Sequence, residues 1–188
     1  GSGLSSSAAL LVALLRGLRE LFAFPLDDME LARLARRAEN ELVGAPVGIM
    51  DQLVCSLGRP DHARFIDART LAVEHIPLPD DAALLVINSN VHHSHAGGEY
   101  RTRRAECEQA CAGLGVASLR DVDPAAITDG RLARLPSPLD RRARHVVSEN
   151  QRVLDVVARL KAGDLGGVGA RLREGHARPV REHLHAAL

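Results

Sequence analysis

The spacing of apolar residues predicts a helix at the start of the chain. From Leu4 onward, apolar residues return with helical period as far as Phe22, and Pro25 marks the end of the helix. No charged residue occurs before Arg16. We therefore expect the first turns of this helix to be buried on all sides.

Two further helices are predicted before residue 58. Asp27 and Asp28 are typical helix-start residues, and the pattern that follows them predicts a helix over Met29–Leu42. A turn rich in glycine and proline comes next, and Ile49–Leu57 is predicted to form a third, short helix.

The apolar pattern then changes to a period of two, which is typical of strands. Strands are predicted over Arg64–Asp67, Ala72–Ile76 and Ala83–Asn88. The last is a continuous apolar run, which favours a strand buried on both faces.

The second half of the chain is predicted to be helical. Helices are expected over Glu99–Leu114, Leu139–Leu160 and Asp164–Leu184, with short elements between residues 121 and 135. The change from mixed to purely helical patterns predicts a boundary near residue 90 and an α+β protein.

Charge and composition narrow the classes of partner. The chain has 24 basic and 24 acidic residues, so its formal net charge is zero, and neither nucleic acid nor a membrane is expected as a partner. Three cysteines are typical of reduced thiols in a cytoplasmic protein. Cys107 and Cys111 have the i, i+4 spacing of a metal pair, although buried small side chains are the interpretation that we prefer.

The opening residues "GSGLSSSAAL" can form an anion site. A helix N-terminus exposes about four backbone N–H groups and a positive dipole end, and no acidic residue precedes Glu20 to neutralise it. Gly1 and Gly3 let the backbone approach a ligand, and the serines at positions 5–7 add hydroxyls, as a phosphate or phosphate–Mg²⁺ ligand requires. The alternatives are a serine that only caps the helix, or a Gly-Ser linker.

Two carboxylates downstream could act on such a ligand. Asp51 follows the turn in "ENELVGAPVGIMDQ" and could orient or deprotonate a hydroxyl. Glu39 could ligate a divalent cation, because Mg²⁺ prefers one or two carboxylates together with phosphate oxygens. The alternatives are a capping or surface role for Asp51, and a solvated helix face near Arg36 and Arg37 for Glu39.

Four motifs together resemble a known family. "GSGLSSSAAL" and "ENELVGAPVGIMDQ" resemble the GHMP family of small-molecule kinases, and "GIMDQ" resembles its galactokinase branch. "INSNVHHSHAGGEYRTRRAEC" and "RRARHVVSEN" agree with that branch and follow in the same order. The resemblance implies an incomplete two-domain α+β fold. Residues 1–90 would be the rear of an ATP-binding N-terminal domain resembling a ribosomal-protein fold, and residues 91–188 the helical start of a ferredoxin-like C-terminal domain.

The resemblance also implies a reaction, in which the γ-phosphate of ATP passes to the C1 hydroxyl of galactose with Mg²⁺. Ser7 and Glu39 would ligate the Mg²⁺, and Asp51 would face the sugar hydroxyl as a base or an orienting charge. The residues implied to bind the ATP phosphates are Gly1, Ser2, Gly3, Leu4, Ser5, Ser6 and Ser7.

Two other clusters are weaker candidates. His93 and His95, next to His92, could face one metal ion, but the resemblance accounts for this stretch as the end of a strand. Arg103 and Arg104 could bind phosphate, but their acidic helix neighbours favour ion pairs.

The resemblance extends over about residues 1–176, and by it the chain corresponds to the middle half of a galactokinase. The segment that carries the sugar-recognition motif and the closing glycine-rich loop are not matched, and His183 stands where a tyrosine is expected. We therefore expect the 188-residue chain alone to be poorly active or inactive. The rival functions are a kinase for a related sugar such as N-acetylgalactosamine or arabinose, a non-catalytic sensor of ATP and sugar, and a helical scaffold without a ligand.

Overall fold

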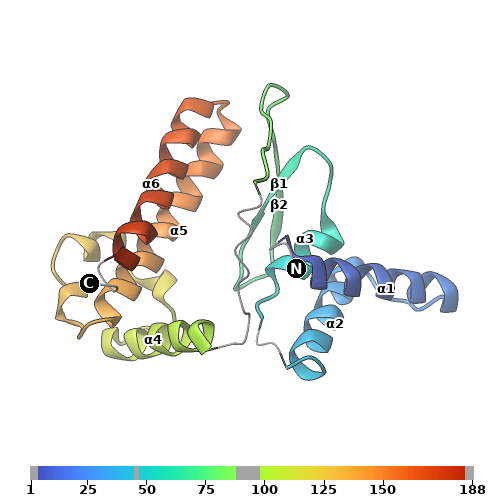
Figure 1. Cartoon of the computed structure of the whole chain (residues 1–188), viewed down its shortest axis with the longest axis horizontal. Helices are drawn as coiled ribbons and strands as arrows, with labels where there is room; N and C mark the ends of the chain where they lie inside the picture. The colour runs from blue at the N-terminus through green and yellow to red at the C-terminus, as the bar shows by residue number, and fades with distance from the viewer. Residues whose placement is uncertain (1–3, 45–46, 88–97, 185–188) are drawn as a thin grey trace. The chain divides into compact units, whose positions relative to one another are not determined.

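The computed structural model describes residues 4–44, 47–87 and 98–184, with residues 98–100 and 177–184 described by their backbone alone (Figure 1). The chain divides into two compact units, Gly1–Gly97 and Gly98–Leu188. Whether these units are the two domains of a GHMP kinase stays a prediction.

The described part of the first unit contains three helices followed by a hairpin. The helices are α1 (Ser6–Phe22), α2 (Asp28–Glu41) and α3 (Met50–Leu57). Strands β1 (His62–Ile66) and β2 (Val73–Pro77) pair in antiparallel register, with Arg64 opposite His75. The three predicted helices and the first two predicted strands are therefore confirmed.

Local chemistry explains where the first two helices meet. At the end of α1, Ala23 adopts the left-handed conformation (φ 50°), and the N–H of Phe24 donates to Arg19 O at 3.1 Å. At the start of α2, Asp27 and Glu30 form a capping box, in which each side chain accepts a backbone N–H at 2.7 Å.

The three helices pack against one another in pairs, through both alanines and larger apolar side chains. The residues buried on them include Ala8, Val12, Leu31, Ala32, Ala35 and Leu53. The prediction that all faces of the first turns of α1 are buried is wrong, because Leu10 and Leu14 are 72% and 57% exposed. Among the described elements, only α2 and α3 pack extensively against α1, and they cover one side of it.

The predicted strand over Ala83–Asn88 is also wrong for its described part. Residues 83–87 form no strand, and Leu84 and Leu85 are 85% and 83% exposed; Asn88 lies outside the described residues. A strand buried on both faces needs neighbouring strands to pair with its backbone. The sheet in the described part of the chain contains only β1 and β2.

Charged groups around Asp28 join the three helices. The Asp28 carboxylate pairs with Arg19 at 2.9 Å and with Arg16 at 3.5 Å, both from α1. The backbone carbonyl of Asp28 accepts a 2.6 Å hydrogen bond from the buried Ser56 hydroxyl of α3, and Arg16 donates to the Ser56 carbonyl. These contacts fix the start of α2 between α1 and α3.

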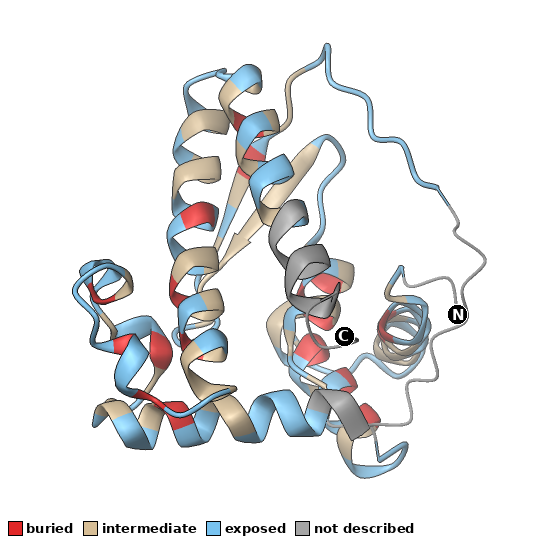
Figure 2. Cartoon of the chain, turned by 60° about the vertical axis from the view of Figure 1, so that its left-hand side comes forward, coloured by how far each residue is buried: buried red, intermediate tan, exposed pale blue. Residues whose placement is uncertain are grey.

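The second unit is helical, as predicted. Its elements are α4 (Gly98–Leu114), the 3₁₀ helices η1 (Leu119–Asp121), η2 (Pro124–Ile127) and η3 (Leu132–Arg134), and the long helices α5 (Leu139–Lys161) and α6 (Leu165–Leu184). Leu119, Ala126 and Leu132 of the 3₁₀ helices form one buried cluster with α4 and α5, and half-buried Cys107 and Cys111 pack against it. Fully buried positions are a minority of the described residues in both units (Figure 2).

Ion pairs hold α6 against α5. Asp155 accepts from Arg171 of α6 and from Arg159 of its own helix at 3.2 Å, and Arg171 also donates to Glu174 at 2.9 Å. On α4, Arg104 pairs with Glu108 at 3.1 Å, which confirms the ion pair predicted for this arginine. None of the helices in the described residues is long and apolar enough to span a membrane.

We predict that Leu31→Ala lowers the free energy of unfolding of the first unit by about 2–5 kcal/mol, because the Leu31 side chain is fully buried. Leu42→Ala is the matched control, since Leu42 follows the same helix but is 85% exposed, and it should change stability by no more than about 0.5 kcal/mol. Urea unfolding followed by circular dichroism measures both, and equal losses would contradict the assignment of this core.

We also predict an acid-sensitive contact between α5 and α6. Hydrogen bonds from Arg171 and then Arg159 lower the pKa of Asp155. The stability gained from this carboxylate is therefore present above its unfolded pKa and is lost as the pH falls through its folded pKa. Asp155→Asn should reduce the fall in melting temperature that the parent chain shows below about pH 4. If the melting temperature of the variant falls as steeply with acid as that of the parent chain, the assignment is refuted.

Candidate functional site

A buried carboxylate joins the three helices of the first unit at a second place. Glu39 of α2 is 6% exposed and accepts two hydrogen bonds. The hydroxyl of Ser7 of α1 donates to Oε1 at 2.7 Å, and the side-chain amide of Gln52 of α3 donates to Oε2 at 2.7 Å. We call these three residues the Glu39 cluster. The interpretation of Glu39 as part of a solvated helix face is wrong.

The cluster is open to solvent on one side only. Ser7 is exposed, whereas Gln52 is 1% exposed. A ligand could therefore reach the Glu39 carboxylate from the α1 side, while the α3 side is closed by protein.

The turn between α2 and α3 is fixed by the residue next to Glu39. The Asn40 side chain accepts from the Val47 N–H at 2.9 Å and donates to the Val47 carbonyl at 3.4 Å. Gly44 lies in the left-handed region at φ 75°, where glycine is favoured. The direction in which α3 begins, and hence the position of Gln52, follows from these contacts.

The donors around Glu39 are neutral. Buried carboxylates are normally paired with a cation or coordinate a metal. In the part of the chain that the structure describes, no arginine or lysine pairs with Glu39. A carboxylate beside a hydroxyl is an oxygen donor set that suits Mg²⁺. No three acidic, histidine or cysteine side chains gather as a metal site within the described residues, so an ion here would need oxygens from its ligand as well.

Among the described residues, no side chain caps the N-terminus of α1. Ser5 occupies the capping position in the left-handed conformation (φ 53°), and its side chain makes no capping hydrogen bond. The first turn contains no acidic residue. The alternative in which this serine only caps the helix is therefore wrong, and the positive end of the α1 dipole lies on the same helix turn as Ser7.

Asp51 lies beside the cluster but is not joined to it. It is half-buried in the first turn of α3, and no hydrogen bond or ion pair connects it with a described residue. Its charge acts on Cys55, one turn further on, whose thiol pKa is raised by burial and secondarily by Asp51. A carboxylate without a protein partner is available to a ligand, whereas the capping role considered for Asp51 has no hydrogen bond to support it.

Several of the remaining candidates cannot be placed relative to this cluster, and the described ones make no side-chain hydrogen bond with it. Gly1, Ser2 and Gly3 lie outside the described residues, as do His92, His93 and His95. Leu4 is 61% exposed, and Ser6 is the exposed first residue of α1.

Sequence reasoning missed two residues, Gln52 and Asn40. Gln52 is the last residue of the quoted "GIMDQ", and an amide within an otherwise mostly apolar segment was the available signal. Asn40 directly follows Glu39 near the end of α2, where a side-chain amide can reach the next turn.

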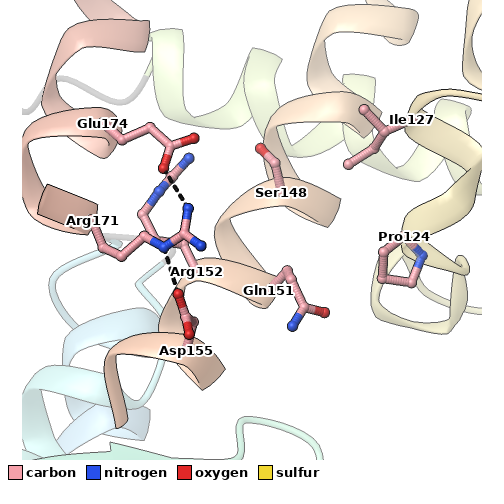
Figure 3. A pocket seen from close by; sticks show the side chains of 8 residues that line it. All are labelled: Pro124, Ile127, Ser148, Gln151, Arg152, Asp155, Arg171 and Glu174. Atoms are coloured by element: carbon pink, nitrogen blue, oxygen red, sulfur yellow. Dashed lines mark hydrogen bonds and ion pairs between the residues drawn. The ribbon is translucent and has the colours of Figure 1, made fainter. Parts of the chain in front are cut away.

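The second unit has a cavity of its own, of about 280 Å³ (Figure 3). None of the residues predicted to bind ATP, Mg²⁺ or sugar lines it. Arg171 spans part of its wall between Asp155 and Glu174. The lining residues are Pro124, Ile127, Ser148, Gln151, Arg152, Asp155, Arg171 and Glu174.

We predict that Asp51→Asn speeds the alkylation of Cys55. Removing the negative charge lowers the pKa of the thiol and raises its thiolate fraction, while the larger effect of burial remains. The expected increase at pH 8 is below about tenfold, the change that one pKa unit would give. Mass spectrometry of the Cys55 peptide measures it, with Cys107 as the internal control, and an unchanged rate would place the two groups out of electrostatic contact.

Comparison with known proteins shows what the chain is similar to. Residues 1–59 match the family described as "GHMP kinases N terminal domain". Over 182 residues the chain is 50% identical to a protein named galactokinase from Streptomyces coelicolor, and this match covers 94% of the chain and 47% of that protein. A crystal structure of Lactococcus lactis galactokinase complexed with galactose matches with a TM-score of 0.82 and 28% identity, over 94% of this chain and 47% of that one.

The chain thus spans about half the length of the relatives it matches. The predicted fold class is confirmed, because the described helices and small sheet are part of the α+β fold of these kinases. Over about half of their length, the chain is similar to these two proteins named galactokinase, and its first 59 residues match the N-terminal domain of the GHMP kinases.

Proposed function

We propose that the chain supplies the phosphate-binding and Mg²⁺-binding part of a galactokinase, which transfers the γ-phosphate of ATP to the C1 hydroxyl of galactose. The observation that carries this proposal is the buried Glu39 carboxylate of α2, which accepts hydrogen bonds from Gln52 and from Ser7. Ser7 lies in the first turn of α1, where the N-cap residue Ser5 makes no side-chain capping hydrogen bond. The two compact units would then belong to the N-terminal and C-terminal domains of that enzyme.

The ATP phosphates would lie at the N-terminus of α1. The backbone N–H groups of the opening residues and the positive end of the helix dipole favour a polyanion there, and no acidic side chain opposes it in the first turn. The residues proposed to surround the phosphates are Gly1, Ser2, Gly3, Leu4, Ser5, Ser6 and Ser7.

Ser7 and Glu39 are the proposed protein ligands of Mg²⁺. When bound with the nucleotide, the ion would neutralise part of the charge on the transferred phosphoryl group. The protein contributes a carboxylate whose position is set before the ligand arrives, because both of its oxygens already accept hydrogen bonds.

Asp51 is the proposed catalytic and sugar-contacting residue. Its carboxylate makes no hydrogen bond with a described residue and stands in the turn of α3 that also carries Gln52. It can accept a hydrogen bond from a sugar hydroxyl and so hold that oxygen for attack on phosphorus.

Galactose is the sugar that we propose, because both relatives are named galactokinases and the solved one is complexed with galactose. A kinase for N-acetylgalactosamine or arabinose is less favoured for the same reason. ATP and the sugar are the proposed partners, in a cytoplasmic setting.

A chimeric enzyme tests the proposal. The chain should replace the corresponding segment of the Streptomyces coelicolor galactokinase, to which it is 50% identical over 182 residues. We predict ATP-dependent phosphorylation of galactose by the chimera. Asp51→Asn should lower turnover by about 10²–10⁴-fold, while the affinity for ATP stays within about twofold.

Asp80→Asn is the matched control, since Asp80 is exposed and lies after the hairpin, and it should leave turnover unchanged. Coupled measurement of ADP release and calorimetric titration with ATP give the two quantities. Full turnover by the Asp51 variant would remove that residue from the reaction.

A further inference from the structure

Gln52 has no role in the function proposed so far, although it contacts the central carboxylate. Its side chain is 1% exposed and donates through Nε2 to Glu39 Oε2 at 2.7 Å. The reverse orientation of the amide would place Oε1 against a carboxylate oxygen, so that two acceptors would face each other. The donor role of Gln52 therefore follows from the charge of Glu39.

The carbonyl oxygen of the same amide is buried without a partner among the described residues, so placing a glutamine here lowers stability. Gln52 Oε1 is buried and has no hydrogen-bond partner in the described part of the chain. An apolar residue of the same length, such as methionine, would fill this place without a buried unsatisfied acceptor. The hydrogen bond to Glu39 is therefore the contact that explains an amide at this position.

The second donor, Ser7, cannot replace it. Ser7 bonds the opposite oxygen of Glu39 and is exposed, so its hydroxyl is the one that a ligand can engage. With Ser7 engaged elsewhere, Gln52 would be the described contact that still fixes the rotation of the Glu39 carboxylate about its last side-chain bond. Groups that orient ligating carboxylates in this way affect metal affinity without touching the metal.

We propose that Gln52 is a positioning residue, which holds the Glu39 carboxylate in the orientation that binds the divalent cation of the nucleotide complex. The proposal rests on the proposed function, because it takes Glu39 to be a ligand of that cation. It assigns Gln52 no contact with ATP or sugar.

The test separates cation binding from nucleotide binding and from folding. For the full 188-residue chain, the affinity for ATP is measured by calorimetry once with Mg²⁺ and once with EDTA, and the ratio of the two is taken as the cation effect. We expect a ratio well above one for the parent chain. Gln52→Met should reduce this ratio by about 10–100-fold, the usual effect of removing a group that orients a metal ligand, with the affinity in EDTA unchanged.

Two further variants distinguish positioning from packing. Ser56→Ala removes another buried hydrogen bond of α3, to the Asp28 carbonyl, and should lower the melting temperature while leaving the ratio unchanged. In a Glu39→Gln background, Gln52→Met should have no additional effect on the ratio, because the carboxylate it would position is absent. If Gln52→Met does not fold, Gln52→Asn, whose shorter side chain withdraws the amide, takes its place.

The outcomes are distinct. A parent ratio of one would overturn the proposed cation site, and the role of Gln52 with it. A parent ratio above one that Gln52→Met or Gln52→Asn leaves unchanged would overturn the role of Gln52 alone. Equal effects of Gln52→Met with and without Glu39 would also overturn it, because they would show that Gln52 acts through packing.

Discussion

The first unit depends on the burial of one negative charge. A carboxylate that is removed from water must be hydrogen-bonded, or it destabilises the fold by several kcal/mol. Glu39 is satisfied only if α1 brings Ser7 and α3 brings Gln52 to its two oxygens at the same time. The helices can come this close because their contacts include alanines, such as Ala8 of α1 and Ala32 and Ala35 of α2. Close packing and the satisfied carboxylate therefore require each other.

The two carboxylates that join these helices differ in the charge of their partners. Asp28, at the start of α2, is paired with two arginines and stands at a helix N-terminus, where a negative charge is stabilising. Glu39, near the other end of the same helix, faces a hydroxyl and an amide. A carboxylate that served only stability would be expected to carry a counter-charge, as Asp28 does. Because no arginine or lysine in the described part of the chain pairs with Glu39, its carboxylate has no protein counter-charge that a cationic ligand would have to displace. One helix thus separates a structural carboxylate from one that is suited to binding.

The sequence was a good guide where a residue's role is set by its near neighbours. Periodicity and the Asp27 cap located α2, and the glycine–proline turn located the start of α3. It was a poor guide where the role depends on distant residues: Ser7 is 32 positions from Glu39 and Gln52 is 13 positions away, so the local charges of Arg36 and Arg37 misleadingly indicated a solvated face. The apolar run over residues 83–87 indicated a strand for the same reason, because the pattern records a preference for burial but not whether a neighbouring strand is there to pair with. The residue pattern made Glu39 and Asp51 candidates beside structural alternatives, and the family resemblance assigned them to one site.

The asymmetry of the Glu39 cluster gives a reason for the serine at position 7. A hydroxyl that donates to a carboxylate still has lone pairs for a cation, whereas an amide N–H that donates has none to offer. Ser7, the exposed donor, can therefore become a ligand of the cation itself. Gln52, the buried donor, can only hold the Glu39 carboxylate in place. Exchanging the two residue types would place the adaptable donor where no ligand can reach it. The order of hydroxyl outside and amide inside is the arrangement in which the same carboxylate can be both fixed by the fold and open to an incoming ion.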